Sequence, residues 1–482
     1  MSSRRNSRAR AAALPCALAL LAAAGCASVP QDAGFPQVQK DVSARTRQQI
    51  QWQRNPEDQA KARTAVHELL QGELTLDTAI RIALLNNRGL QAEYASLGIS
   101  QADLVQAGLV SNPVLFVTAI HGDPGTELTV DLVQELIGLL TLSARKQVAG
   151  AAFEATKLRV AQSAVQLIAQ VKAAYYTVEG DEQALELFQT ATSATEAAAE
   201  LAFRQRSAGT LNRRDQSLHQ AFYAQTLLEV ARTQAQLRAD REWLNRLLGL
   251  WGEDTRWTLP HRLPEVPADA PPLAELEMTA IDRRLDLAAA RRETEAVYRA
   301  AGITRSTRYL SALGIGVEFK RDPDGAKLAG PIVELGLPLF DQGQAKVAGA
   351  DAQVQRSEEL LRALAVDIRS EVREMRDRMT AVQEQARYYR DVLLPLQQTI
   401  LDETLLRYNG MLLGIYDLLL AKQAQLNSAR DYIVTSRDYW IARADLERAV
   451  GGRLPAGFSG PAASAAPSNA GGEPHQHGET QR

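Results

Sequence analysis

Proline is almost missing from two long stretches of this sequence. None lies between Pro124 and Pro260, and only Pro395 lies between Pro338 and Pro455. Both stretches are rich in Ala, Leu, Gln, Glu and Arg, which favour the α-helix, whereas a proline breaks or kinks one. The sequence therefore predicts helices far longer than those of a compact domain.

The longest of these helices is predicted over about 142–206, where apolar residues recur at three- and four-residue spacing. At 1.5 Å per residue it would be a rod of roughly 100 Å. Its many alanines predict close helix-to-helix packing in a coiled-coil-like layer. Pro395 predicts a kink within a second long helix, because it removes a backbone hydrogen bond; a surface kink without a role is the alternative.

Two Asp-Pro turn signals interrupt the helical pattern, HGDPGTE at 121–127 and KRDPDGAK at 320–327. Around both turns the apolar period changes to two, although the arm VLFVTAIH before the first turn alternates poorly. The alternating apolar positions are Leu128, Val130, Leu132, Leu313, Ile315, Val317, Phe319, Pro331, Val333, Leu335 and Leu337. Each flank is about ten residues long, the length of a tilted membrane strand. A half-buried soluble hairpin alternates equally well, but hairpins joined by such long helices have no obvious soluble core to lie on.

These features occur once in each half of the chain. Four sets of residues match in order, at offsets of 197 to 202: 87–92 with 284–289, Asp123-Pro124 with Asp322-Pro323, Val171 with Val372, and Gly209 with Met411. The matches predict two repeats, at 74–250 and 273–451, joined by a Pro-rich linker at 251–272. The remaining tail, 452–482, is rich in Gly, Ala, Ser and Pro and is expected to be disordered.

The N-terminus has the composition of an export signal. Four arginines among the first ten residues precede an apolar run that ends at Cys26. The residues before it, Ala23-Ala24-Gly25, resemble the lipobox of bacterial lipoproteins, with Ala in place of the usual Leu. We therefore expect a lipoprotein signal peptide at 1–25 and a lipid on Cys26, followed by an N-terminal extension at 26–73. An ordinary secretory signal is the alternative.

Composition and motifs argue against an enzyme or a nucleic-acid-binding protein. The net charge of −3 leaves no basic excess to neutralise phosphates. The sequence shows no Gly-rich phosphate loop, no nucleophile beside a base and no paired cysteines, so we expect no catalytic residues and no cofactor. His475 and His477 form a His-x-His pair, but two imidazoles in a polar tail make a poor metal site. We therefore assign no metal site.

The repeat resembles the TolC family of outer-membrane efflux ducts over roughly residues 74–451. Pro338-Leu-Phe340-Asp341-Gln-Gly343 looks like the family's step from strand to helix. Leu285-Asp-Leu-Ala-Ala resembles its early-helix signature, and Arg407-Tyr408 with Asp417-Leu-Leu-Leu-Ala resembles its helix-tip motif. In that tip motif Met411 occupies the usual Gly position, while the first half keeps Gly209. Gly410 is a candidate to make the turn instead.

The resemblance implies a mainly α fold with membrane β-structure. Long helical hairpins would form a periplasmic α-barrel, and each protomer would add four strands to a transmembrane β-barrel. Four strands cannot close a barrel, and an open edge in lipid leaves backbone groups unsatisfied. The sequence itself therefore demands an oligomer. A homotrimer with twelve strands is what the resemblance implies.

The resemblance also implies roles for residues at the ends of the rod. The expected periplasmic entrance and adaptor-docking residues are Gly209, Arg213, Arg214, Asp215, Arg407, Tyr408, Met411 and Asp417. For Asp215 and Asp417, helix capping is the alternative. The alternation of the strands makes Glu127, Asp131, Glu318 and Glu334 candidates for the barrel lumen, where an acidic lining would favour cations.

Together these features predict the outer-membrane duct of a tripartite efflux pump, anchored by lipid and extending into the periplasm. Its partners would be a periplasmic adaptor and an inner-membrane pump, which must supply the energy. The signature steps look closer to the heavy-metal branch of the family, with organic solutes as the alternative cargo. Two other classes stay open: a periplasmic membrane-fusion adaptor and a structural coiled-coil lipoprotein.

Overall fold

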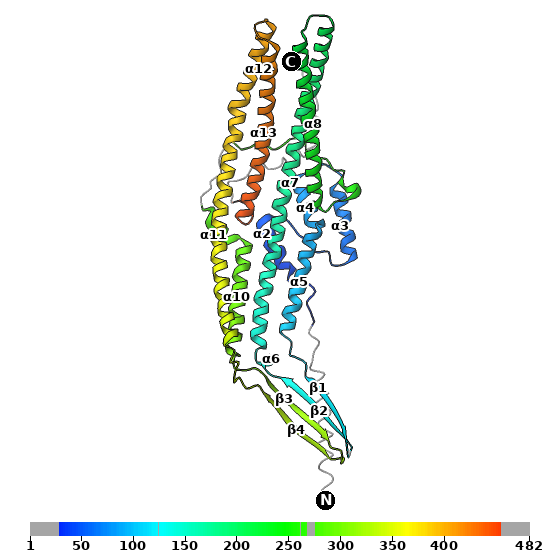
Figure 1. Cartoon of the computed structure of the whole chain (residues 1–482), viewed down its shortest axis with the longest axis vertical. Coiled ribbons are helices and arrows are strands. Elements are labelled where there is room, and N and C mark those ends of the chain that lie inside the picture. Colours follow the sequence, from blue (N-terminus) through cyan, green and yellow to red (C-terminus); the bar gives the residue numbers. More distant parts are fainter. Residues whose placement is uncertain (1–27, 124, 261, 268–274, 455–482) are drawn as a thin grey trace, which may run out of the picture.

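The computed structural model describes residues 28–123, 125–260, 262–267 and 275–454. Several predicted features lie outside these ranges: the signal peptide, Cys26, Pro124, His475 and His477. Within them the molecule is a long rod, with a β-sheet at one end and two helical turns at the other (Figure 1). None of the helices in this part of the chain has a stretch long and apolar enough to cross a bilayer.

The same order of elements occurs twice along the chain. The first set is α4 (Leu76–Asn86), α5 (Arg88–Ala107), β1 (Val114–Gly122), β2 (Gly125–Glu135), α6 (Ile137–Leu140), α7 (Leu142–Ser207) and α8 (Arg213–Leu248). The second set is α9 (Leu276–Arg283), α10 (Leu285–Ser306), β3 (Leu313–Arg321), β4 (Lys327–Leu335), α11 (Gln344–Tyr388), η2 (Tyr389–Leu393), α12 (Leu394–Asn409) and α13 (Ile415–Ala449). The boundaries of the two repeats as separate units stay a prediction.

Helix α7 is the spine of the molecule. Its 66 residues correspond to about 100 Å, as the sequence predicts. It packs against α8, α10, α13 and α5, and its alanines lie in the tightest contacts: Ala155, Ala161 and Ala164 are fully buried. Because alanine adds little bulk, the neighbouring helices can approach closely along the whole length of α7.

The second long helix contains a π-helical turn, η2, where α11 passes into α12. Pro395 lies just after this turn, at the start of α12, so the predicted interruption is present. The π-turn also explains a change in the repeat offset. Val171 and Val372, both buried, differ by 201 residues, whereas the helix tips at Gly209 and Met411 differ by 202. A π-turn holds one more residue than an α-turn and absorbs that insertion.

The four strands form one antiparallel sheet in the order β1-β2-β3-β4. The middle pair joins the two halves of the chain, with Asp131 opposite Glu318. Both Asp-Pro turns lie at the far end of the sheet, and a Cβ added to Gly125 would lie 3.4 Å from Pro323. The predicted strands are therefore confirmed for the described residues.

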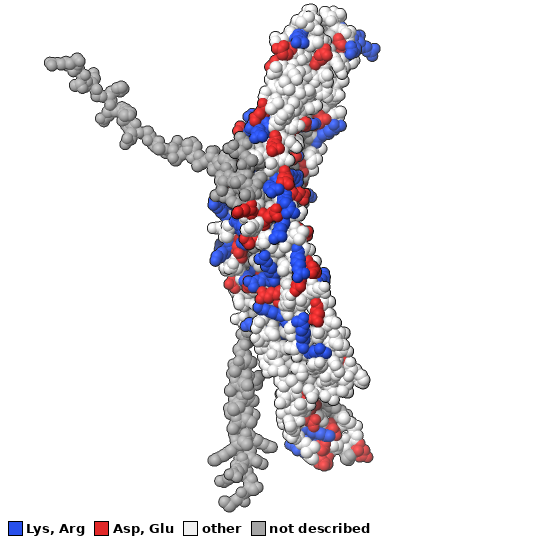
Figure 2. Space-filling model, turned by 90° about the vertical axis from the view of Figure 1, so that its left-hand side faces the viewer, with Lys and Arg blue, Asp and Glu red and all other residues white. Residues whose placement is uncertain are grey.

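Segments outside the repeat pack around the middle of the rod. Two helices that the sequence analysis did not predict, α2 (Phe35–Thr46) and α3 (Pro56–Leu69), precede the first set. The linker contains the short helix η1 (Gly252–Thr255), and its Trp257, Leu259 and Val266 are buried in the main core. At the start of the segment expected to be the tail, the Arg453 N–H donates to the Arg45 carbonyl at 3.0 Å and Gly452 is buried. Charged side chains crowd around this middle region and occur again at both ends of the rod, with mostly uncharged surface in between (Figure 2).

Candidate functional site

The sheet has one acidic face and one apolar face. Directly paired residues of neighbouring strands point to the same side, so the register assigns every side chain to a face. All four predicted lumen residues share one side: Glu127, Asp131, Glu318 and Glu334. Glu135 and Lys320 lie on the same side and were missed. The Lys320 ammonium lies 2.9 Å from Glu127 and 3.5 Å from Asp322, near the turns.

The opposite face is apolar over most of its length. It consists of Leu115, Val117, Ala119, Leu128, Val130, Leu132, Leu313, Ile315, Val317, Phe319, Ala329, Pro331, Val333 and Leu335. Many of these side chains are exposed, with Val333 at 71% and Leu115 at 62%. Charged residues of this face, Arg321 and Lys327, lie at the turn end. A continuous exposed apolar band is typical of a surface that contacts another protein or a membrane.

Strand β1 is apolar on both faces, since Val114, Phe116 and Ile120 lie on the acidic side. This explains why its sequence alternates poorly. Among the described strands, β1 and β4 are the edges of the sheet, each with one side not paired to a strand. Both edges therefore carry backbone groups available to a further strand.

The two helix tips have the same backbone geometry. The N–H of Thr210 donates to the carbonyl of Gln205 at 3.0 Å, and the N–H of Leu412 donates to that of Arg407 at 2.8 Å. Gly209 has a φ of 77° and Met411 a φ of 60°. Both turns are thus left-handed helix endings of the Schellman type.

The suggestion that Gly410 makes the second turn is wrong. Gly410 has a φ of −79°, and Met411 itself adopts the left-handed conformation in the glycine position. A residue with a Cβ is strained there by roughly 1 kcal/mol. The Met411 side chain is 93% exposed and that of Leu412 is 77% exposed, so the second tip presents an apolar knob that the first tip lacks.

The two tip carboxylates lie in the first turns of α8 and α13. Asp417 accepts a hydrogen bond from the backbone N–H of Gly414 at 3.2 Å and so caps α13. At the first tip the cap of α8 is Asn212, which accepts from the Asp215 N–H at 2.9 Å, and the Asp215 carboxylate accepts from the Asn212 side-chain amide at 2.7 Å. Capping by the carboxylate itself is therefore present at Asp417, whereas Asp215 supports the cap.

The other predicted tip side chains, three arginines and a tyrosine, have no such structural role. In the described residues, the side chains of Arg213, Arg214, Arg407 and Tyr408 make no hydrogen bond or ion pair within the chain. The three arginines are exposed and Tyr408 is half-buried. Their polar groups are free to bind another chain, and their predicted role in the entrance stays a prediction.

The step from strand to helix differs between the halves. In the second half Asp341 accepts the Gly343 N–H at 2.8 Å, and Gly343 has a φ of 73°. A Cβ at Gly343 would lie 2.9 Å from the Arg308 carbonyl oxygen, so only glycine fits. Pro338 precedes this turn, and the Phe340 side chain is 94% exposed. In the first half the short helix α6 replaces the turn, and Glu135 caps it by accepting the Gly138 N–H at 2.9 Å.

Each half also has a contact, called a joint below, between a helix end and a helix start. The end of α8 meets the start of α5 in the first half, and the end of α13 meets the start of α10 in the second. At the first joint, Asn87 accepts the Leu90 N–H at 2.9 Å and donates to the Leu247 carbonyl at 2.9 Å. Asn86 donates to the Gly249 carbonyl at 2.6 Å. Two neutral amides thus satisfy the end of α8 and the start of α5.

The second joint uses charges at the matching positions. Arg284 is buried and donates to both Asp286 oxygens, at 3.0 and 2.6 Å, and to Glu371. Arg448 also pairs with Glu371, at 2.9 Å. Burial alone would raise the pKa of Glu371, but these two arginines hold it below its usual range. The two segments match in the sequence, at 87–92 and 284–289, but the match does not indicate that they meet the helix ends.

Helix α7 also carries buried acids that the sequence analysis missed. Glu179 is 3% exposed, and burial raises its pKa to about 8, with nearby Glu182 adding to the shift. Asp181 is 8% exposed, and Gly180 lies between the two. The Glu-Gly-Asp run directly after the apolar and aromatic stretch Ala173-Ala-Tyr-Tyr-Thr-Val178 was the signal available in the sequence.

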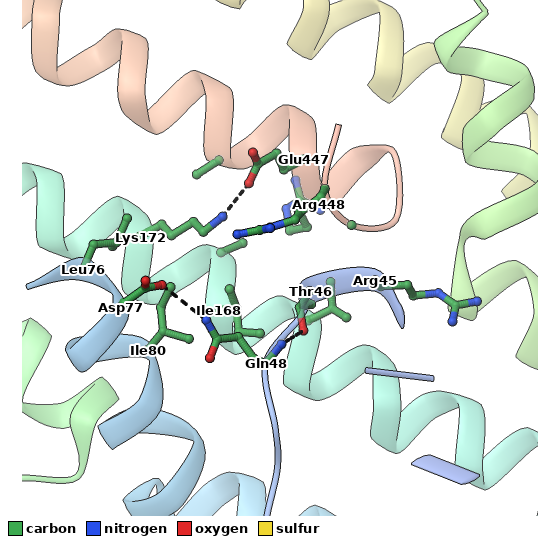
Figure 3. A pocket seen from close by; sticks show the side chains of 15 residues that line it. Arg45, Thr46, Gln48, Leu76, Asp77, Ile80, Ile168, Lys172, Glu447 and Arg448 are labelled. Carbon is green, nitrogen blue, oxygen red and sulfur yellow. Dashed lines mark hydrogen bonds and ion pairs between the residues drawn. The ribbon is translucent and has the colours of Figure 1, made fainter. Parts of the chain in front are cut away.

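A cavity of about 100 Å³ lies beside the second joint, between α2, α4, α7 and α13 (Figure 3). Its charged lining is mostly paired internally: Lys172 with Glu447 at 2.5 Å, Arg45 with Asp41 at 3.2 Å, and Arg448 with Glu371. The cavity therefore has no converging set of free groups that would define a ligand. In the described part of the chain, no three His, Cys, Asp or Glu side chains are placed to hold a metal ion.

Known structures share this arrangement of sheet and helices. Over 78% of this chain, the outer-membrane channel OprN matches with a TM-score of 0.66 and 19% identity, covering 90% of OprN. The channel-forming protein CusC matches 79% of this chain and 93% of its own, with a TM-score of 0.66 and 16% identity. The outer-membrane protein VceC of Vibrio cholerae matches 79% of this chain and 97% of its own, with a TM-score of 0.66 and 18% identity.

The fold is therefore that of the outer-membrane channel proteins, as the resemblance to the TolC family predicted. At the level of sequence, the chain is 22% identical over 390 residues to the cobalt-zinc-cadmium resistance protein CzcC of Cupriavidus metallidurans. The match covers 79% of this chain and 90% of that protein. No protein-family model matches the sequence.

Proposed function

We propose that this chain forms the outer-membrane duct of a tripartite efflux system. The sheet carries this proposal: one of its faces is apolar and exposed, and the other holds the acidic residues Glu127, Asp131, Glu318 and Glu334. An apolar face turned to lipid and a polar face turned to a lumen are what a transmembrane barrel requires.

The duct would be built from three copies. The open edges β1 and β4 cannot remain unpaired in hydrocarbon, because each free N–H or carbonyl there costs several kcal/mol. If β4 of one copy pairs with β1 of the next, three copies give a closed barrel of twelve strands. Detergent extraction as a stable trimer would support this assembly, and a stable monomer would contradict it.

The helical end would face the periplasm and meet the partners. The free Arg213, Arg214 and Arg407 side chains and the exposed knob of Met411 and Leu412 are accessible to a periplasmic adaptor. An inner-membrane pump would supply energy to transport. Anchoring through a lipid on Cys26 remains part of the proposal.

The cargo we favour is metal cations, with small organic compounds as the second candidate. Two observations favour cations: the acidic face of the sheet, and the relative named for resistance to cobalt, zinc and cadmium. The test is the growth and metal content of a deletion strain exposed to metals, dyes and antibiotics. Sensitivity limited to metals supports cation cargo, whereas sensitivity limited to organic compounds supports the second candidate.

Channel activity itself is tested by single-channel recording of the reconstituted trimer. Replacing both Asp131 and Glu318 with their amides should lower the preference for cations over anions. The Glu229→Gln control on α8 removes one charge far from the sheet and should leave that preference unchanged. Replacing Arg407 and Tyr408 with Ala should raise the conductance if they hold the entrance closed.

The two other classes predict different molecules. A membrane-fusion adaptor would have no sheet with an exposed apolar face, and a structural coiled-coil lipoprotein would have no hairpins. The four-stranded sheet joined to two helical hairpins argues against both. Failure of the purified trimer to conduct ions in a bilayer would reopen them.

A further inference from the structure

The cations at the turn end of the sheet differ between its two faces. On the acidic face, Lys320 lies 2.9 Å from Glu127 and 3.5 Å from Asp322, so its charge is balanced within the chain. On the apolar face, Arg321 and Lys327 are exposed, and the side chain of neither makes a hydrogen bond or ion pair to a described residue. The cations of the apolar face are therefore free to bind a group outside the chain.

The strand register holds Arg321 and Lys327 side by side. They are directly opposed on β3 and β4, which places their Cβ atoms about 5 Å apart. Like charges in this position destabilise a sheet. An anion bound between the two side chains removes that cost, and a planar guanidinium beside an ammonium suits a phosphate group. His121 lies at the same end of this face, with its Nδ1 2.8 Å from Thr126 Oγ1.

The acidic residues of the turns do not supply this anion. Asp322 lies beside Lys320, and Asp324 accepts the backbone N–H of Ala326 at 2.9 Å. Asp123, in the first turn, makes no ion pair with a described residue. The described strands place no carboxylate on the apolar face. Three acids thus lie within a few residues of the cations or in the neighbouring turn, and none of them pairs with either cation.

The two cations lie at one end of the apolar band. From Leu313 to Arg321, strand β3 spans about 27 Å, which after strand tilt is comparable to the height of the apolar band of a membrane barrel. The other end of the face, at Gln134, Leu313 and Leu335, has no charged residue in the described strands. Cations that needed only contact with water would suit both ends equally. Their presence at the turn end alone points to an anionic partner on that side of the membrane.

We propose that Arg321 and Lys327 of each copy bind the phosphate group of a glycolipid in the outer leaflet of the outer membrane. This inference rests on the duct function proposed above. With the helical rod in the periplasm, the hairpin turns lie at the outer leaflet, where phosphorylated glycolipid is the anionic lipid. The Arg321 guanidinium donates to the phosphate oxygens, and the Lys327 ammonium adds the second positive charge.

The test measures lipid binding to the detergent-purified, full-chain oligomer by native mass spectrometry. The probes are lipid A, lipid A without its phosphate groups, and phosphatidylglycerol. The wild type should bind lipid A about tenfold more tightly than either of the other two lipids. Combining Arg321→Gln with Lys327→Gln should weaken the binding of lipid A about twentyfold, because each cation near a charged lipid surface contributes separately.

Two further variants separate loss of the site from other effects of substitution. Arg356→Gln combined with Arg369→Gln removes two cations from α11 that are exposed and unpaired in the described residues, and it should bind lipid A like the wild type. Arg321→Lys combined with Lys327→Arg keeps both charges and should stay within about threefold of the wild type. A retained affinity in this exchange shows that charge at these positions, not an intact native sequence, is what lipid A requires.

The outcomes that contradict the site are distinct. Equal binding of lipid A with and without phosphate would overturn it, as would an equal loss of binding in the α11 control. Equal binding of lipid A and phosphatidylglycerol would overturn the assignment to a glycolipid.

Single-channel recording of the same preparations tests the duct function separately. An oligomer that conducts ions but does not prefer the phosphorylated lipid would overturn the lipid site alone. An oligomer that does not conduct would count against the duct function, and the lipid measurement would still decide whether the two cations bind phosphate.

Discussion

The two joints of the molecule have the same backbone and different chemistry. Gly249 and Gly451 follow the ends of α8 and α13 and have positive φ, 69° and 84°. Each lies against the last residue of a short helix, Asn86 of α4 or Arg283 of α9. The side chains differ: Asn87 bridges the first joint with amide hydrogen bonds, and Arg284 bridges the second with ion pairs. The crossing of the helices determines the backbone conformation at each joint. Side chains of different types can form the hydrogen bonds that the free backbone groups at the helix ends need.

The two helix tips likewise have the same backbone conformation and different side chains. Gly209 and Met411 make the same turn, although only one of them is glycine. The hydrogen bonds that close the turn determine its conformation, and the second tip accepts strain to place an apolar side chain at its end. The following predictions test how far this equivalence of backbone extends.

The largest effect is expected for Arg284→Met. The change leaves Asp286 and Glu371 partly buried without their main cation, and we expect a loss of about 3 kcal/mol in unfolding free energy. Guanidinium unfolding of the detergent-solubilised protein measures it. Arg292→Met on the exposed side of α10 is the matched control and should cost less than about 1 kcal/mol. Equal losses would show that the second joint gains nothing from its charges.

Gly249→Ala should cost about 2 kcal/mol or more. Its Cβ would lie 2.7 Å from the Asn86 carbonyl oxygen, in addition to the strain of a positive φ. Gly209→Ala has the strain without the contact and should cost about 1 kcal/mol. The same denaturation experiment compares them, and a larger loss at Gly209 would contradict the role given to close packing at the joint.

Glu179→Gln tests a buried carboxyl that is present in only one half of the chain. At the repeat offset of 201, the equivalent residue of α11 in the second half is Thr380. The pKa of Glu179 is raised from 4.5 to about 8, so the native state keeps a proton that the unfolded state releases above pH 4.5. Wild-type stability should therefore fall as pH rises from about 4.5 to 8 and change no further through this group above that. The variant should be more stable than the wild type at high pH, and similar to it near pH 4.5. If the difference in thermal unfolding temperature between the variant and the wild type does not change with pH, the raised pKa of Glu179 is not its cause.

Asn87→Ala should cost about 1 to 2 kcal/mol, less than the charged counterpart at Arg284. The change removes a helix cap and a hydrogen bond to the end of α8. Asn87→Asp keeps the cap on Leu90 and loses the donor to Leu247, so it should recover about half of the loss. If Asn87→Ala costs as much as Arg284→Met, the two joints do not differ in energy.

The smallest effect is expected for Met411→Gly. Glycine accepts the left-handed turn without strain, so the variant should gain up to about 1 kcal/mol. The expected gain in local stability is measured as slower amide exchange at Leu412. The reciprocal Gly209→Met should weaken the first tip by a similar amount. A loss of stability in Met411→Gly would mean that Met411 makes packing contacts in the assembled entrance.

The spacing of apolar residues along the sequence predicted most of the fold. The helix over 142–206 and the strands with alternating apolar residues follow from local spacing, which is why the structure confirms them. The same spacing puts the four acidic residues on one side of the sheet, and their role in a lumen stays a prediction. The helices α2 and α3 were missed because they lie outside the repeat, so no second copy supported them. The expected turn at Gly410 failed because the hydrogen-bond pattern of the tip outweighs the intrinsic preference of glycine.

The joints and the buried acids could not be predicted in the same way. Asn87 meets Leu247 across 160 residues of sequence, and Asp181 meets Arg437 from the other half. Nothing in the local pattern around these residues says which distant helix end they satisfy. The paired glycines Gly249 and Gly451, spaced like the two tips, were the one available sign that the helix ends recur in equivalent places.

The π-turn before Pro395 makes the two helical hairpins of the chain differ in length by one residue. The second hairpin contains one residue more than the first between its buried Val372 and its tip, and η2 stores that residue as a local bulge. In an assembly of three copies, six hairpins of two alternating kinds would surround the axis. Sixfold symmetry is then unattainable at the entrance. An aperture made of two unlike sets can open by moving one set while the other stays as the frame.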